Sequence, residues 1–395
     1  MLGRVSVRGF REVAPVSGWG GSGEGTEAFR REVRAWLAAN LDPDRDGASF
    51  AARRAFGRRL AAAGWNCPGW PTAHGGRGAS LSEQVAFHEE YARAGAPPRV
   101  DHIGVTMVGP TLIDHGTPAQ RARFLPRIAV VDELWCQGYS EPGAGSDLAA
   151  VATRARLDGD RWVLTGQKIW TSLAQVADWC FVLARTSPVP AGGPRQAGLS
   201  YLLVPMRQPG VTVRPIRQLT GESEFNEVFF DEARTDQDLV VGEVGGGWRI
   251  AMATLTYERG AATMGQQIGF QRELDGVVAL ARRTGADADP AIRARIARAW
   301  IGLSVMRSHT LRMLAGEPRP YASSVMKVLW SRWHRALGEL AMEVRGAAGL
   351  LTGGGPDDVD EWQRLFLFSR ADTIYGGSDE IQHNIIAQRI LGLPR

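Results

Sequence analysis

The chain contains 395 residues, of which 44% are hydrophobic and 22% are charged. This length is too great for one simple core and the balance is that of globular proteins, so we expect two or three packed units. The formal net charge is only +4 and arginines are interleaved with acidic residues, which argues against a nucleic-acid-binding protein.

Signals for targeting, disulfides and metals are weak. No stretch approaches 18 apolar residues, and the N-terminus lacks the apolar segment of a signal peptide, so we expect no membrane span. Residues 1–25, which end in a Gly/Ser-rich stretch, are interpreted as a flexible leader. The odd set Cys67, Cys136 and Cys180 contains no C-x-x-C pair, which argues against a disulfide framework or zinc site and fits a reducing cytoplasm. The seven histidines are scattered and predict no metal site.

Residues 26–133 are predicted to form an N-terminal helical domain. Thr26 is the expected N-cap of its first helix, which carries an apolar face of Phe29, Val33, Trp36 and Leu37 at helical spacing. Further helices are expected at 49–60, 81–94, 100–115 and from Thr117-Pro118 onward.

Residues 134–240 change to short β-rich runs, among them RWVLTGQKIW and LSYLLVPM, separated by Gly, Pro, Asn and Asp. This pattern predicts a small, mostly antiparallel β domain. Residues 241–395 return to long amphipathic helices and predict a C-terminal helical bundle. The expected fold is therefore α+β with several domains, and a cleft between a β domain and a bundle is a natural place for a flat cofactor.

The string WCQGYSEPGAGSDL at residues 135–148 is the most informative local pattern. Its small residues allow backbone N–H groups to approach a ligand closely, and Ser140 and Ser146 add hydroxyls. Taken alone, the glycines could equally close a β-hairpin. The full string, however, resembles the signature of the acyl-CoA dehydrogenase family. The resemblance continues, in order, through residues 65–80, GQKIWTS at 166–172 and IYGGSDEIQ at 374–382.

The resemblance implies a helical domain, a β-barrel-like domain and a C-terminal four-helix bundle. It also implies FAD-dependent α,β-dehydrogenation of an acyl-CoA thioester to the 2,3-enoyl-CoA, with electron-transfer flavoprotein as the acceptor. An acyl group on a carrier protein is an alternative substrate. The cofactor-binding residues implied are Tyr139, Ser140, Gly145, Trp170, Ser172, Ser378 and Glu380, together with Gly346 and Gly349, which match a turn that touches the dinucleotide of a neighbouring subunit.

The reaction needs a carboxylate that removes an α-proton of the thioester and a donor that stabilises the carbonyl oxygen. Many family members carry the base directly after the C-terminal tyrosine, where this chain has Gly376. A second branch places the base on the first long C-terminal helix, where Glu258 stands here. The resemblance therefore implies that Glu258 is the base and that the Gly376 N–H is an oxygen donor. It also implies that Arg259 lies near CoA and Ser146 near the CoA phosphates. Glu141 is the competing carboxylate, and Asp379 and Glu380 are expected to cap a helix.

The chain departs from the family pattern at the adenine end of the FAD site. The Phe-Gly after the first long C-terminal helix is absent, and either Arg282 or Arg283 could take the place of the usual arginine. His383 stands where arginine is common. These departures predict an unusual homo-oligomer or a heteromer in which a paralogous subunit completes the site. The alternatives are a flavin oxidase or monooxygenase on the same fold, and a non-catalytic partner subunit; both are disfavoured by Glu258.

Overall fold

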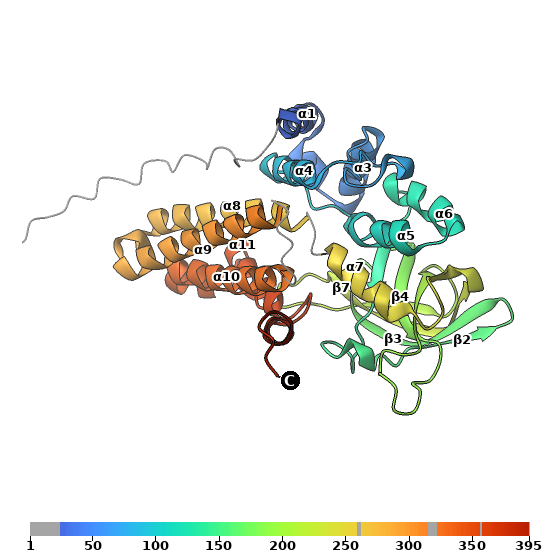
Figure 1. Ribbon diagram of the computed structural model, residues 1–395. Helices are drawn as coiled ribbons and strands as arrows, with labels where there is room; N and C mark the ends of the chain where they lie inside the picture. The colour runs from blue at the N-terminus through green and yellow to red at the C-terminus, as the bar shows by residue number, and fades with distance from the viewer. Residues whose placement is uncertain (1–23, 259–261, 315–321, 356–357, 395) are drawn as a thin grey trace, which may run out of the picture.

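In the computed structural model, helical parts precede and follow a β sheet along the chain, and the N-terminal helices lie beside the sheet (Figure 1). The structure describes residues 24–258, 262–314, 322–355 and 358–394. The expected leader therefore lies outside the described residues as far as residue 23, and so does Arg259, while residues 24 and 25 already belong to the first helix. The expected α+β architecture of helical, β and helical parts is confirmed.

The N-terminal helices bury the apolar face that their spacing predicts. Val33 and Leu37 of α1 are buried against Phe56 and Phe87. The first helix begins at Glu24, two residues before the expected N-cap Thr26. The helices of this part are α1 (Glu24–Asn40), α2 (Pro43–Gly47), α3 (Phe50–Ala62), η1 (Thr72–His74), α4 (Leu81–Arg93), the π-helix η2 (Gly104–Val108), α5 (Gly109–His115) and α6 (Pro118–Ala129).

The middle of the chain forms an eight-stranded, mostly antiparallel sheet in the order β6-β7-β3-β2-β4-β5-β8, with β1 paired to β4 in parallel. Its two longest strands, β3 and β7, pair along their length. The strands and short helices are β1 (Trp135–Gly138), η3 (Leu148–Ala150), β2 (Arg154–Asp158), β3 (Arg161–Ser172), β4 (Trp179–Arg185), β5 (Leu199–Pro205), β6 (Val211–Pro215), β7 (Phe225–Asp236), η4 (Gln237–Leu239) and β8 (Val240–Val241).

Strands β4 and β5 are apolar throughout because both of their faces are covered. Phe181 and Leu183 point to the face that packs against the N-terminal helices and α7 (Gly247–Glu258). Cys180 and Val182 point to the opposite face, where they pack with side chains of β3 and β7. Side chains alternate between the two faces of a strand, so a continuous apolar run is required here.

The C-terminal helices form a separate core that packs beside α4 (Figure 1). Phe270, Leu274 and Leu340 are buried in it. The expected helix over 359–374 is shorter, since α11 ends at Phe368 and a 3-10 turn follows. The remaining elements are α8 (Ala262–Thr284), η5 (Ala286–Ala288), α9 (Pro290–Leu314), α10 (Ala322–Arg345), η6 (Gly346–Leu350), α11 (Glu361–Phe368), η7 (Ala371–Thr373), α12 (Asp379–Ile385) and the π-helix η8 (Ile386–Ile390).

A buried ion pair fixes the glycine-rich turn after β1 to the sheet. Lys168 of β3 is 0% exposed, and its Nζ donates to a carboxylate oxygen of Glu141 at 2.8 Å and to the carbonyls of Tyr139 and Leu183 at 3.0 and 2.8 Å. All three ammonium N–H groups are thus used. Glu141 also accepts the backbone N–H groups of residues 152 and 153. Burial alone raises the pKa of Glu141, but Lys168 and these donors outweigh burial and hold that pKa below its ordinary value.

We predict that Lys168→Met lowers the free energy of unfolding by about 3–5 kcal/mol, because it leaves the Glu141 carboxylate buried without its cation. Urea denaturation would measure the loss. Arg161→Gln is the matched control, since it removes an exposed ion pair from the same strand and should cost less than about 1 kcal/mol. Equal losses in the two variants would contradict the prediction.

Candidate active site

The β3–β7 ladder is interrupted at the predicted flavin-binding segment. Register shifts between Lys168 and Thr171, so β3 carries one extra residue against β7. Trp170 lies in this bulge with a left-handed backbone (φ 60°) and is 57% exposed, touching the Phe225 ring edge-on. A large aromatic residue rarely adopts this conformation, and bulges commonly re-aim side chains next to functional sites. Ser172, two residues on, is half-buried.

The segment after β1 lies directly beside this bulge. The Ile169 N–H donates to the Ser140 carbonyl at 2.9 Å. Tyr139 is buried, with its ring edge against Phe181. The hydroxyls of Ser140 and Ser172 have no hydrogen-bond partner among the described residues. The fold thus brings together the two segments that sequence analysis assigned to the cofactor.

The turn that follows is open to solvent. Gly145 and Ser146 are exposed, and a Cβ added at Gly145 would meet nothing within 4 Å. Neither crowding nor a left-handed backbone requires glycine at position 145, and the turn is open to the approach of a ligand. The neighbouring Asp147 pairs with Arg195 of the β4–β5 loop at 2.7 Å.

The C-terminal signature forms a tight turn between η7 and α12. Gly376 and Gly377 both have left-handed backbones (φ 63° and 89°), which favour glycine. Ser378, not Asp379 or Glu380, caps α12 by accepting the Ile381 N–H. Glu380 is exposed in the first turn, where its own backbone N–H and the Ser378 hydroxyl lower its pKa.

The expected helix cap at Asp379 is therefore wrong. Its carboxylate is buried and accepts hydrogen bonds from Ser331 at 3.0 Å and Arg332 at 2.7 Å, both on α10. The Arg332 guanidinium also contacts His383. These bonds hold the beginning of α12 against α10.

A buried charge cluster lies on the other side of the turn. His334 of α10 contacts Asp372 through Nδ1 at 2.5 Å and Glu273 of α8 through Nε2 at 2.9 Å. The second oxygen of Asp372 accepts the Tyr375 hydroxyl at 2.7 Å. Burial alone lowers the pKa of His334, but the bonds to Asp372 and Glu273 outweigh burial and raise it to about 9. Sequence analysis missed this cluster, because only the fold brings these side chains together.

Gly346 and Gly349 lie at the opposite end of α10. Lys327, near the start of that helix, donates to the Asp372 carbonyl beside the Gly376 turn. The helix continues to Arg345, about 27 Å farther at 1.5 Å per residue, before the Gly346 turn begins. The two glycine turns of one chain are therefore far apart. This separation is compatible with the prediction that the Gly346 turn contacts the cofactor of a neighbouring subunit.

Glu258 is the last residue of α7, and its side chain lies outside what the structure describes. The last turns of this helix are tied to α5 by two contacts. The hydroxyls of Thr254 and Thr111 are 2.8 Å apart and buried, and the Tyr257 hydroxyl donates to Asp114. The backbone of Glu258 is thus anchored at the junction of α7 with the N-terminal helices.

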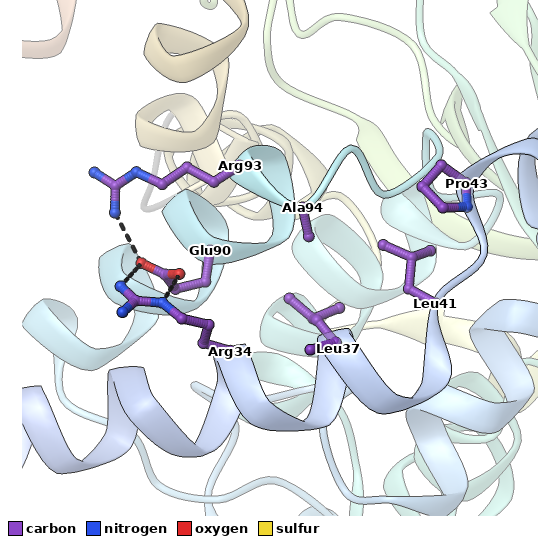
Figure 2. Close-up of a pocket in the computed structure, with 8 residues that line it drawn as sticks. Arg34, Leu37, Leu41, Pro43, Glu90, Arg93 and Ala94 are labelled. Atoms are coloured by element: carbon purple, nitrogen blue, oxygen red, sulfur yellow. Dashed lines mark hydrogen bonds and ion pairs between the residues drawn. The ribbon is translucent and has the colours of Figure 1, made fainter. Parts of the chain in front are cut away.

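Other potential sites are separate from these segments. A cavity of about 450 Å³ lies between α1 and α4, lined by Arg34, Leu37, Leu41, Glu90 and Arg93 among others (Figure 2). Glu90 pairs there with both arginines, and no predicted site residue lines the cavity. Within the described ranges, no cluster of three or more His, Cys, Asp or Glu side chains could hold a metal, and no helix is long and apolar enough to cross a membrane.

Comparisons with known proteins decide the family. Models of the N-terminal, middle and C-terminal domains of acyl-CoA dehydrogenases match residues 23–132, 136–233 and 245–391. The chain belongs to the acyl-CoA dehydrogenase family. Its members are FAD-dependent oxidoreductases of lipid metabolism, and the resemblance drawn from the sequence is confirmed.

Individual relatives are similar over nearly the full length of this acyl-CoA dehydrogenase. It is 61% identical to acyl-CoA dehydrogenase IpdE1 of Mycobacterium tuberculosis over 93% of this chain and 98% of that protein. Among solved structures, the Tcur3481–Tcur3483 steroid acyl-CoA dehydrogenase is 31% identical with a TM-score of 0.82, covering 95% of this chain and 99% of that one. The ChsE4–ChsE5 complex of M. tuberculosis is 31% identical with a TM-score of 0.79, covering 95% and 98%.

We predict that His334 makes stability depend on pH. Its folded pKa of about 9 exceeds the ordinary value of 6.5, so the stabilisation is complete below pH 6.5 and is lost as pH rises through 9. The loss should be on the order of 3 kcal/mol. Urea denaturation between pH 6 and 10 would measure it, and His334→Gln should remove that part of the pH dependence. A variant that retained the full dependence would show that another group titrates.

Proposed function

We propose that this chain catalyses α,β-dehydrogenation of an acyl-CoA thioester, with Glu258 as the base and FAD as the cofactor. When bound, the flavin accepts the hydride that leaves the β-carbon. The chain's own residues then have three tasks: they hold the flavin, remove the α-proton and stabilise the charge that grows on the thioester oxygen.

We assign the base to Glu258 because the competing carboxylates are already paired with cationic side chains. Glu141 is paired with Lys168, Asp379 with Arg332, and Asp372 with His334. Gly376 offers no carboxylate, and Glu380 lies exposed at the start of α12. Family membership and the anchored end of α7 leave Glu258 as the best candidate for the base. Arg259, which lies outside the described residues, is proposed to bind CoA.

The bulge of β3 supports a flavin site in this chain. An exposed indole at Trp170 offers a flat apolar surface, and the free hydroxyls of Ser140 and Ser172 offer donors on adjoining segments. On the adjoining segment, the buried Tyr139 ring packs at right angles against the ring of Phe181 and so fixes the position of this segment. The strained backbone at Trp170 is the kind of cost that a ligand site retains. Ser146, on the exposed turn nearby, is proposed to face the CoA phosphates.

The oxygen of the thioester would be bound by the Gly376 N–H. The left-handed backbone at Gly376 and Gly377 fixes the direction of that N–H independently of any side chain. Ser378 and Glu380, at the N-terminus of α12, are proposed to contact the cofactor. A preorganised donor of this type commonly contributes 10²–10³ in rate.

A second subunit is proposed to complete the site. Gly346 and Gly349 lie far along α10 from Gly376, and the adjoining Leu350 and Leu351 are 82% and 71% exposed, as residues at a subunit interface commonly are. The Tcur3481–Tcur3483 and ChsE4–ChsE5 structures carry two differently named chains. We therefore propose a heteromer with a paralogous subunit, a steroid-like acyl group, and electron-transfer flavoprotein as the acceptor.

We predict that anaerobic addition of a bulky ring-bearing acyl-CoA bleaches the flavin absorbance of the holoenzyme, and that straight-chain thioesters do so less. Glu258→Gln should keep the flavin and lower the bleaching rate by at least about 10³-fold, because no other carboxylate takes the proton. Glu243→Gln, an exposed change on the loop before α7, is the matched control. Undiminished bleaching in Glu258→Gln would rule out this base, and an unbleached wild-type holoenzyme would rule out the dehydrogenase.

We predict that Trp170→Gly separates flavin binding from stability. The ratio of flavin to protein after gel filtration should fall roughly tenfold, because the indole surface is lost. The free energy of unfolding of the flavin-free chain should stay unchanged or rise by up to about 1 kcal/mol, because glycine tolerates the left-handed backbone. Glu232→Gly is the control, since Glu232 is an exposed residue with φ 58° on β7. Equal flavin loss in both variants would contradict the role of Trp170.

A further inference from the structure

One face of α10 holds the Gly376 turn from both sides. Lys327, Ser331 and His334 follow one another at intervals of four and three residues, so they lie along one stripe of the helix. Each of them bonds a residue that flanks the turn. Lys327 and His334 bond Asp372 before it, and Ser331 bonds Asp379 after it.

The contact before the turn is the more buried of the two. Asp372 is 1% exposed, and three groups converge on it: the His334 imidazole, the Tyr375 hydroxyl and the Lys327 ammonium at its carbonyl. The Lys327 ammonium also lies 4.9 Å from the centre of the Tyr375 ring. The residue directly before Gly376 is therefore held through both its ring and its hydroxyl.

His334 provides the charge balance in this cluster. The groups that face it are Asp372 from η7, Glu273 and the Phe270 ring from α8, and Trp333 from its own helix. A protonated imidazole places one positive charge between the two carboxylates of Asp372 and Glu273. A neutral imidazole leaves these two carboxylates without their shared cation at a site that is mostly out of water, which is costly.

We infer that His334 is a positioning residue for catalysis: its imidazolium, bound between Asp372 and Glu273, holds Tyr375 and thereby the Gly376 N–H in the place where the thioester oxygen binds. This role rests on the proposed function. Removal of the imidazolium leaves Asp372 and Glu273 in mutual repulsion across α8 and η7. The turn then shifts away from α10, and the N–H no longer points at the oxygen. A misplacement near 1 Å can cost about 10²-fold in rate.

The test compares two unreactive ligands on the holoenzyme. One is a 3-thia-acyl-CoA, which keeps the thioester carbonyl, and the other is the matched S-alkyl-CoA thioether, which lacks the carbonyl. Titration of the flavin absorbance gives both dissociation constants. Wild type should bind the thioester more tightly than the thioether. In His334→Gln we expect that preference to fall at least fivefold, with the affinity for the thioether unchanged, and the bleaching rate at saturating substrate to fall roughly 10- to 100-fold.

A second variant separates charge from shape. Glu273→Gln/His334→Gln removes one of the two carboxylates together with the imidazolium, so it relieves their repulsion and should recover part of the preference for the thioester. Arg335→Gln is the matched control, because it removes an exposed ion pair with Glu339 from the next position of the same helix. In wild type, the preference should also decline as pH rises through 9, where His334 loses its proton. This last measurement needs no variant.

The possible results test the positioning role of His334 and the proposed function separately. A preference for the thioester that is unchanged in His334→Gln and flat across pH 7–10 in wild type overturns the positioning role, and so does an equal loss of affinity for both ligands. Neither ligand is oxidised, so the comparison does not depend on turnover. A wild-type holoenzyme that binds the thioester with the expected preference but is not bleached by any acyl-CoA would instead contradict the proposed function.

Discussion

The ion pair between Lys168 and Glu141 joins the two segments on which the candidate flavin site depends. It links the middle of β3 to the turn after β1, and its geometry leaves no N–H of the ammonium unused. Two charges in a fully buried place are stable only when both are satisfied, so this pair allows one arrangement of the two segments. Two residues beyond Lys168, the bulge turns Trp170 outward. The fixed position of Lys168 thus determines where the strand bulges and where the indole is exposed.

In the C-terminal part, too, buried charged side chains fix a turn because each of them is paired. Helix α10 carries the side chains that hold the Gly376 turn, and α8 supplies the carboxylate that completes the charge balance of His334. The turn itself contains no charged side chain, so its backbone can be presented to a ligand without a competing carboxylate. The proposed base on α7 and the buried cluster behind Gly376 are therefore compatible parts of one arrangement.

Because α10 is long, one chain cannot place the residues at both ends of this helix against the same ligand. Its first half serves the turn at Gly376, whereas its far end presents Gly346 and the exposed Leu350 and Leu351. A rigid helix cannot bring both ends to one ligand headgroup. This constraint, together with the missing Phe-Gly after α8, favours a site shared between subunits.

The sequence by itself determined the order of the domains, the family and the residues of its signatures, because periodicity and linear motifs are local properties. The β-rich run LSYLLVPM indicated β5, and Thr117-Pro118 indicated the start of α6. Only the tertiary structure decided the pairing of Lys168 with Glu141, the outward turn of Trp170 and the meeting of His334 with Asp372 and Glu273. It also corrected Asp379 from a helix cap to a buried partner of α10. These contacts join residues 27 to 61 positions apart, and no local pattern encodes which distant partner will satisfy a buried charge.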